Sequence, residues 1–307
     1  MAVDMAVDAA AVVAAEAGVF IMNGWVLLTV NSFTLGGLLF LLAAGFSLVF
    51  GLMRIPNLTH GAFFMLGGYI GVGLLRMGLH FWAAALGAAL ALAAIGGLIE
   101  RVLLRRLAGQ ELAQVLVTLG VSLMISDLCL IVWTGDPIPV PTPAELSRSL
   151  PILGIMFPVY RLLVVAVAVA AAVGLWLMMD WTRLGATIRA GVDDAPMARV
   201  CGIHVSRLFT VVFCLGAGLA GFAGMVGGPI LSVYPGLDAD MLPLALVVVI
   251  LGGVGSLPGA LVGSFIIGAL YNFGQAMFPE FAYVALFLPM LLVLVLRPQG
   301  LMGRQTA

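Results

Sequence analysis

Long apolar stretches dominate the hydrophobic pattern of this chain, and few charged residues interrupt them. A helix that crosses a membrane needs about 20 consecutive apolar residues. Candidate stretches lie at about 10–30, 33–52, 58–77, 80–104, 113–133, 158–180, 207–231, 240–254, 258–278 and 281–297. The first contains Glu16 and Asn23, and the eighth is short. The pattern therefore predicts eight to ten crossings, some of them short or broken.

Composition makes a soluble domain an implausible alternative. Of the 307 residues, 63% are hydrophobic and 9% are charged, whereas a soluble domain carries about 25% charged residues. Glycine and proline lie inside continuous apolar runs, which differ from the alternating pattern of a membrane barrel. We therefore expect an all-α polytopic membrane protein, folded as a bundle of transmembrane helices.

The basic residues indicate both an orientation and an exclusion. All 13 are arginine, and the absence of lysine excludes a P-loop ATPase site, which needs a lysine on the phosphates. By the positive-inside rule, clustered arginines mark the cytoplasmic side. The clusters are Arg101, Arg105 and Arg106, then Arg183, Arg189, Arg199 and Arg207, and finally Arg297 and Arg304. They place the C-terminus in the cytoplasm.

Cysteine and histidine positions indicate no catalytic or metal chemistry. Cys129, Cys201 and Cys214 have unrelated spacings, so neither a disulfide framework nor a metal site is predicted. No nucleophile and base stand at a recognisable spacing, and we expect no cofactor.

A polar interruption, "IPNLTH", breaks the apolar pattern at 55–60. Pro56 disfavours helix at the residue before it, and Asn57 or Thr59 can accept the first backbone N–H groups of a new helix. Two interpretations stay open. In one, a capped helix starts at the membrane interface and His60 is in water. In the other, Asn57, Thr59 and His60 line a transport pathway. The arginine pattern places this interruption at the cytoplasmic ends of its helices.

A second interruption, "LGGVGSLPGA", lies at 251–260. One interpretation is a tight turn between helices. The other is that the two interruptions occupy corresponding places in two halves of a transporter. The residues of this predicted turn are Gly252, Gly253, Gly255, Ser256, Pro258 and Gly259.

The polar segment 181–207 predicts one short helix over 196–201. Pro196 suits the first helical position, carboxylates just before it favour the helix N-terminus, and Gly202 suits a left-handed residue after the end. Six residues span only about 9 Å, too little to cross a membrane. Such a helix can present side chains to a partner groove, or it can be an ordinary interfacial helix. The side chains offered would be those of Met197, Ala198, Val200 and Cys201.

Asp127 is the deepest acidic residue of the middle spans. A charged aspartate at mid-bilayer costs about 2.5–3.5 kcal/mol, so it usually faces a cavity or a partner. Trp133, six residues later, marks the outer interface, so Asp127 can also lie close to water. A pathway residue and an ordinary interfacial residue stay open as alternatives.

Four motifs together resemble one family: "NLTHGAFFMLGGYIG" at 57–71, "IRAGVDDAPMARVCGI" at 188–203, "LGGVGSLPGALVG" at 251–263 and "RPQGLMG" at 297–303. Their order is similar to that in the LivH-type permease subunits of ABC importers for branched-chain amino acids. The resemblance makes 31–303 the permease domain, 1–30 an N-terminal extension or first helix, and 304–307 a tail.

The resemblance implies a function and a set of partners. The chain would sit in a bacterial inner membrane and move branched-chain or related amino acids inward. Its partners would be a second permease subunit in a heterodimer, two cytoplasmic ATPase subunits and a periplasmic solute-binding protein. The chain itself would not be an enzyme.

The short helix would be the coupling helix that docks on the ATPase. The docking residues would be Asp193, Asp194, Met197, Ala198, Arg199 and Gly202. The alternative function, from another class, is a gradient-driven secondary transporter of a small polar solute with Asp127 as its ion site.

Overall fold

The computed structural model describes residues 2–53, 56–152 and 155–303, and these are mostly helical. The tail 304–307, with Arg304, lies outside the described residues. The α-helices are α1 (Ala2–Met53), α2 (Thr59–Arg76), α3 (Phe81–Val102), α4 (Glu111–Trp133), α5 (Val159–Trp181), α6 (Arg183–Asp193), α7 (Ala195–Val200), α8 (Val205–Leu231), α9 (Leu237–Gly252), α10 (Leu257–Met277) and α11 (Ala282–Leu296). Three 3-10 turns, η1 (Leu104–Leu107), η2 (Ala144–Leu146) and η3 (Pro279–Phe281), and two strands, β1 (Ser149–Ile152) and β2 (Ile155–Pro158), complete the chain.

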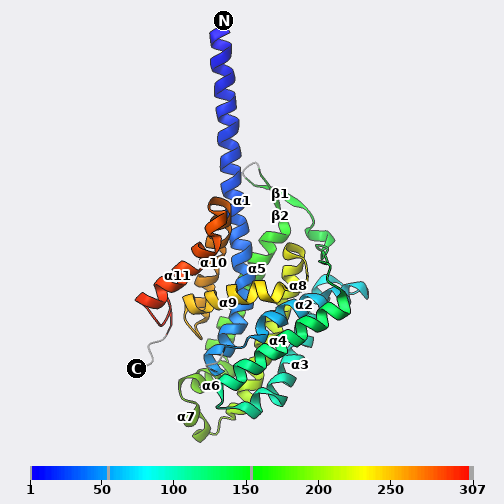
Figure 1. Ribbon diagram of the computed structural model, residues 1–307, viewed down its shortest axis with the longest axis vertical. Coiled ribbons are helices and arrows are strands. Elements are labelled where there is room, and N and C mark those ends of the chain that lie inside the picture. Colours follow the sequence, from blue (N-terminus) through cyan, green and yellow to red (C-terminus); the bar gives the residue numbers. More distant parts are fainter. Residues whose placement is uncertain (1, 54–55, 153–154, 304–307) are drawn as a thin grey trace.

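The two helices predicted at 10–30 and 33–52 are one continuous helix, α1 (Figure 1). The polar residues Ser32 and Thr34 at this junction do not break it, because their hydroxyls donate to carbonyls four residues earlier. Ser32 Oγ donates to the Leu28 carbonyl and Thr34 Oγ1 to the Val30 carbonyl, each at 2.8 Å. These hydroxyls bond within the helix rather than interrupt it, so the prediction of two separate segments was wrong.

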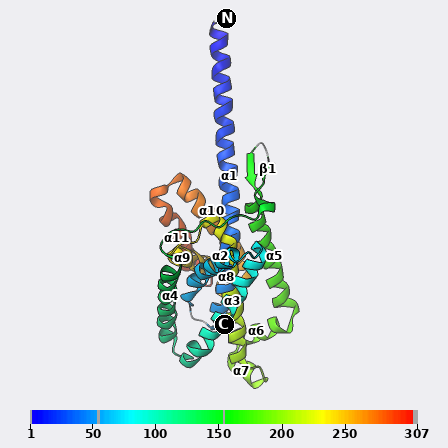
Figure 2. The same cartoon turned by 90° about the vertical axis from the view of Figure 1, so that its right-hand side faces the viewer.

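The bundle is built around α1 and α8. From Leu38 to Val49 almost every α1 side chain is buried. The largest interfaces join α3 to α8, α1 to α10 and α2 to α8. Figure 2 shows α4 and α5 on opposite sides of this centre, and few of their side chains are buried.

Helix length agrees with a polytopic membrane bundle that includes short members. Among the described residues, six helices are long and apolar enough to cross a membrane: α1 from Gly24, α3, α4, α5, α8 and α10. Two further helices are shorter, α9 with 16 residues and α11 with 15. The 18-residue helix α2 is not among the six, and its first turn carries the polar residues Thr59 and His60.

Glycines set the spacing between α8 and its neighbours. A Cβ placed on Gly224 would lie 1.8 Å from the Phe64 carbonyl oxygen of α2, and one on Gly221 would lie 2.8 Å from Cβ of Leu92 on α3. Such contacts are too close for any side chain. The glycine-rich run 218–228 therefore allows α2 and α3 to pack directly on the α8 backbone, as small residues do in membrane bundles.

The segment between α4 and α5 contains short regular elements. It ends in an antiparallel hairpin, in which Ser149 pairs with Pro158 and Ile152 with Ile155. Earlier in the segment, Ile138 forms a bridge with Val233 at the end of α8. Together these contacts cover one end of the bundle, and α6 and α7 lie at the opposite end (Figure 1).

Replacing Gly224 by alanine should destabilise the fold, because the new methyl group would collide with the α2 backbone. Overpacking of this kind costs about 1–3 kcal/mol. Thermal unfolding of the purified protein in detergent measures the effect as a lower Tm. Gly120→Ala is the matched control, since a Cβ there meets nothing within 4 Å. Equal Tm values for the two variants would contradict this packing.

Candidate functional site

The first turn of α2 begins inside the bundle. Asn57 is 3% exposed, and Thr59 and His60 are fully buried. His60 Nε2 donates to the Leu42 carbonyl at 3.0 Å, and Leu42 lies eleven residues before the end of α1, about 16 Å along that helix. The motif does lie at the ends of two helices, between Met53 of α1 and Thr59 of α2, but the interpretation that places His60 in water was wrong.

The first backbone N–H groups of α2 have hydrogen-bond partners within the protein. Asn57 Oδ1 accepts the N–H of Thr59, the first residue of α2, at 3.2 Å, as predicted for it, although the residue at the N-cap position is Leu58. The Leu58 N–H donates to Thr118 Oγ1 at 3.3 Å, and Thr59 Oγ1 donates to the Thr118 carbonyl at 3.1 Å. A helix start in an apolar surrounding needs such partners, because its first N–H groups have none within the helix. Thr118 on α4, which the sequence did not single out, anchors it.

Asp127 lies apart from this buried cluster. It follows Thr118 by nine residues, which is about 13 Å along α4 and half a turn around it, and its side chain is exposed. Its neighbour Ser126 faces the bundle and donates to Asp238 Oδ1 at 3.3 Å. The structure brings together three of the four predicted pathway residues and places Asp127 on the outer face of α4.

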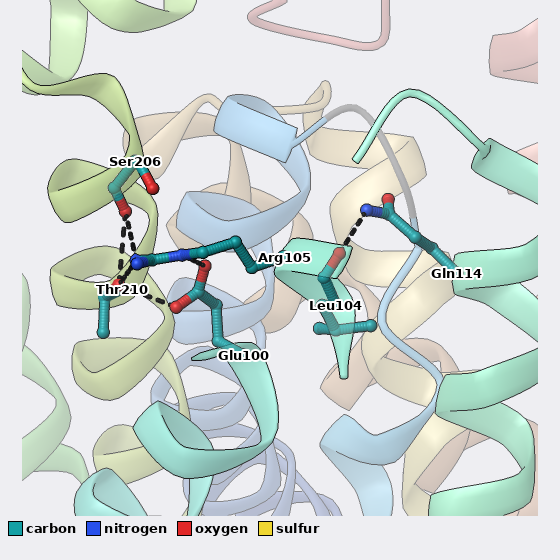
Figure 3. Close-up of polar contacts among 6 residues, drawn as sticks. All are labelled: Glu100, Leu104, Arg105, Gln114, Ser206 and Thr210. Carbon is teal, nitrogen blue, oxygen red and sulfur yellow. Dashed lines mark hydrogen bonds and ion pairs between the residues drawn. The ribbon is translucent and has the colours of Figure 1, made fainter. Parts of the chain in front are cut away.

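An ion pair between the buried Glu100 and the exposed Arg105, which the sequence did not predict, lies where α3 and η1 meet α8 (Figure 3). Glu100 is 2% exposed, and its Oε1 lies 3.5 Å from Arg105 Nε. Thr210 Oγ1 donates to Glu100 Oε2 at 2.6 Å. Arg105 also donates to Thr210 Oγ1 at 2.7 Å and to the Ser206 carbonyl at 2.9 Å. The carboxylate is thus paired and hydrogen-bonded, as a buried charge requires.

Arg105 therefore has a structural role in the bundle, whereas the sequence predicted only a role in orientation. The sequence signal was Glu100, a lone acid at the end of an apolar run and five residues before Arg105. Sequence spacing alone could not show that the partner helix, α8, closes the pair.

The short helix predicted at 196–201 is present as α7, one residue earlier. Asp194 Oδ1 accepts the Met197 N–H at 2.9 Å, and Gly202 has the left-handed φ of +82° predicted for it. Met197 and Val200 are 57% and 83% exposed. Ala198 is only 4% exposed. The expectation that Ala198 is offered to a partner was therefore wrong, because it faces the rest of the chain.

A further helix, α6, precedes α7 where the sequence suggested a loop. Thr182 starts it, since its Oγ1 accepts the Gly185 N–H at 3.2 Å. A Cβ on Gly185 would lie 2.1 Å from the Met179 carbonyl oxygen, and one on Gly191 would lie 2.8 Å from Leu208 Cδ2. Close packing on the ends of α5 and α8 stabilises a segment whose glycines disfavour an isolated helix.

The second interruption forms a tight turn between α9 and α10. Gly253 and Gly255 have φ values of +104° and +76°, which favour glycine. Ser256 Oγ accepts the Gly259 N–H at 3.1 Å and starts α10. The C-terminal segment folds onto this turn through the Met302 N–H, which donates to the Gly252 carbonyl at 3.0 Å. Two motifs far apart in the sequence therefore form one structural unit.

These features define a multi-pass α-helical membrane protein with a buried polar helix start and a short exposed helix at one end. The family described as "Branched-chain amino acid transport system / permease component" matches residues 28–296, and the chain belongs to it.

Several characterised proteins are similar along most of their length. The chain is 29% identical to the high-affinity branched-chain amino acid transport permease BraD of Pseudomonas aeruginosa, over 90% of this chain and 94% of BraD. It is 28% identical to LivH of Escherichia coli K12, over 89% and 94%. The ribose import permease RbsC of Escherichia coli K12 is 27% identical, over 76% and 73%. No solved structure matches the chain.

Replacing Arg105 by methionine should destabilise the protein, because Glu100 would stay buried without its charged partner. Leaving a buried acceptor unpaired costs about 1–3 kcal/mol, seen as a lower Tm in detergent. Arg106→Met is the control, since Arg106 is the adjacent arginine, also exposed, and within the described residues it forms no ion pair with Glu100. The double variant Glu100→Gln with Arg105→Met should recover part of the loss. If Arg106→Met lowers Tm as much as Arg105→Met, the pair does not stabilise the fold.

Proposed function

We propose that this chain is the membrane-spanning permease of a binding-protein-dependent ABC importer and carries a branched-chain or related amino acid into the cytoplasm. The observation that carries the proposal is the family match over residues 28–296. The relatives that cover about 90% of the chain are named for branched-chain amino acids, and the ribose permease covers less of it. This supports an amino acid, rather than a sugar, as the solute.

The end of the bundle that holds α6 and α7 would be the cytoplasmic, ATPase-facing end. Arginines gather there, as the positive-inside rule requires; they are Arg183, Arg189, Arg199 and Arg207. The exposed Met197 and Val200 form an apolar projection. Beside it, a surface groove of about 370 Å³ runs between α6 and the start of α8, lined partly by Leu184, Ile203 and His204. A projection next to a groove suits docking on a separate subunit, with Asp193, Asp194, Arg199 and Gly202 around it.

ATP hydrolysis would take place on that separate subunit, because the chain has no lysine for a P-loop. The C-terminus would lie on the same, cytoplasmic side in a bacterial inner membrane. A periplasmic binding protein would then meet the opposite end, where the β1–β2 hairpin lies.

A second permease subunit would cover the outer face of α4. Leu116, Leu123 and Ile131 are 58%, 60% and 76% exposed, and Asp127 shares their face of the helix. Lipid tails would disfavour this carboxylate. A heterodimer that packs here would place Asp127 along the pathway between subunits. The buried Asn57, Thr59 and His60 would then support the pathway wall from inside.

Reconstitution tests the proposed function directly. Proteoliposomes that contain this chain, a second permease subunit, two ATPase subunits and the binding protein should accumulate radiolabelled leucine when ATP is supplied to the ATPase side. The control omits the ATPase subunits and should show no accumulation.

Accumulation by this chain alone under a proton gradient would contradict the importer and support a secondary transporter. In that case Asp127→Asn should abolish the gradient-driven uptake, because Asp127 would be the ion site.

Val200→Asp should uncouple ATP hydrolysis from uptake, because a charge would enter the apolar docking surface of α7. The reconstituted complex should lose several-fold in uptake per ATP hydrolysed. Val200→Thr keeps the shape of the side chain without a charge and should stay close to the unmodified protein. Unchanged coupling in Val200→Asp would remove α7 from the docking surface.

A further inference from the structure

A small cavity lies where the start of α2 meets α4 and η1. Its volume open to the centre of a water molecule is about 10 Å³. The lining residues are Met53, Asn57, Leu104, Gln114, Thr118 and Phe213. Three of these six, Asn57, Gln114 and Thr118, have polar side chains.

Two of the lining side chains are amides, and in each of them one of the two polar atoms already forms a hydrogen bond. Asn57 Oδ1 accepts the Thr59 N–H, so its Nδ2 is the atom left over. Gln114 Nε2 donates to the Leu104 carbonyl at 3.0 Å (Figure 3), so its Oε1 is left over. These two bonds settle the orientation of both amides, because N–H groups donate and carbonyls accept.

Both leftover atoms are buried and unpaired. Asn57 and Gln114 are 3% and 4% exposed. Within the described residues, neither Asn57 Nδ2 nor Gln114 Oε1 has a hydrogen-bond partner. Buried amides in folded proteins are normally satisfied. The cavity therefore offers one donor on the α2 side and one acceptor on the α4 side.

We propose that this cavity binds one water molecule, which accepts a hydrogen bond from Asn57 Nδ2 and donates one to Gln114 Oε1. The occupant must both accept and donate, and it must fit a space close to the smallest that holds a water, about 10–15 Å³. Ligand pockets are typically about 300–1,000 Å³, so this cavity is far too small for the transported solute. Thr118 Oγ1 provides a third polar contact on the wall.

The water would join two separate hydrogen-bond networks. On one side are the start of α2 and Thr118. On the other side, Gln114 holds Leu104 of η1, and the next residue, Arg105, holds Ser206 and Thr210 near the start of α8 (Figure 3). Because α8 follows α7 directly, the water would connect the buried polar start of α2 to the end of the bundle that carries α7. The role of this link in coupling rests on the proposed function, whereas the water site does not.

A high-resolution cryo-electron microscopy map of the assembled transporter tests the site first. A density peak within about 2.7–3.2 Å of both Asn57 Nδ2 and Gln114 Oε1 is expected. No peak there, in a map that resolves other buried waters, would overturn the proposal.

A double-mutant cycle on thermal stability in detergent tests whether the two atoms share a partner. Asn57→Ser keeps an acceptor for the start of α2 but loses Nδ2, and Gln114→Met keeps the side-chain length but loses Oε1. If one water bridges them, the Tm loss in the double variant should be clearly smaller than the sum of the two single losses.

The control cycle pairs Gln114→Met with Ser256→Ala, at the start of α10, and these two losses should add. Additive losses for Asn57→Ser with Gln114→Met would overturn the shared water. Neither readout involves solute uptake, so a failure of the transport proposal leaves this test unaffected.

Discussion

The buried start of α2 is the constraint on which the arrangement of the surrounding helices depends. A helix that begins inside an apolar bundle exposes backbone N–H groups that water cannot reach, and each must find a protein partner. Asn57 and Thr118 supply partners for the first N–H groups. The His60 ring bonds the Leu42 carbonyl and so ties the same turn to α1. The position of α2 is therefore specified from two neighbouring helices at once.

Close backbone contact supplies the second constraint. Gly224 lets α8 touch the α2 backbone at Phe64, and Gly221 lets it touch α3 at Leu92. In a membrane, contact with lipid tails is as apolar as contact between helices, so the hydrophobic effect does not favour helix association. Association depends instead on close packing and hydrogen bonds. The glycines provide the packing, and the few buried polar side chains provide the hydrogen bonds.

The polar groups are concentrated at one corner, where α3, η1, α4 and α8 meet. Glu100 and Arg105 bind α3 and η1 to α8, and Gln114 binds η1 to α4. Ser206 and Thr210, which Arg105 contacts here, lie near the start of α8, and α8 directly follows α7. Under the proposed function, these contacts would connect the docking helix α7 to the membrane bundle, so that movement of a docked ATPase subunit could reach the bundle.

The class of the protein, most helices and the helix-start chemistry could be predicted from local sequence. Length and hydropathy indicate membrane helices, and Asp194, Pro196 and Gly202 predicted α7, because capping involves residues only a few positions apart. The tertiary structure decided the rest. It merged 10–30 with 33–52, buried His60 and Ala198, and turned Asp127 outward. It also joined Glu100 to Thr210, 110 residues apart. Local chemistry determines where a helix can start, but which face it buries depends on the neighbours that the whole chain brings to it.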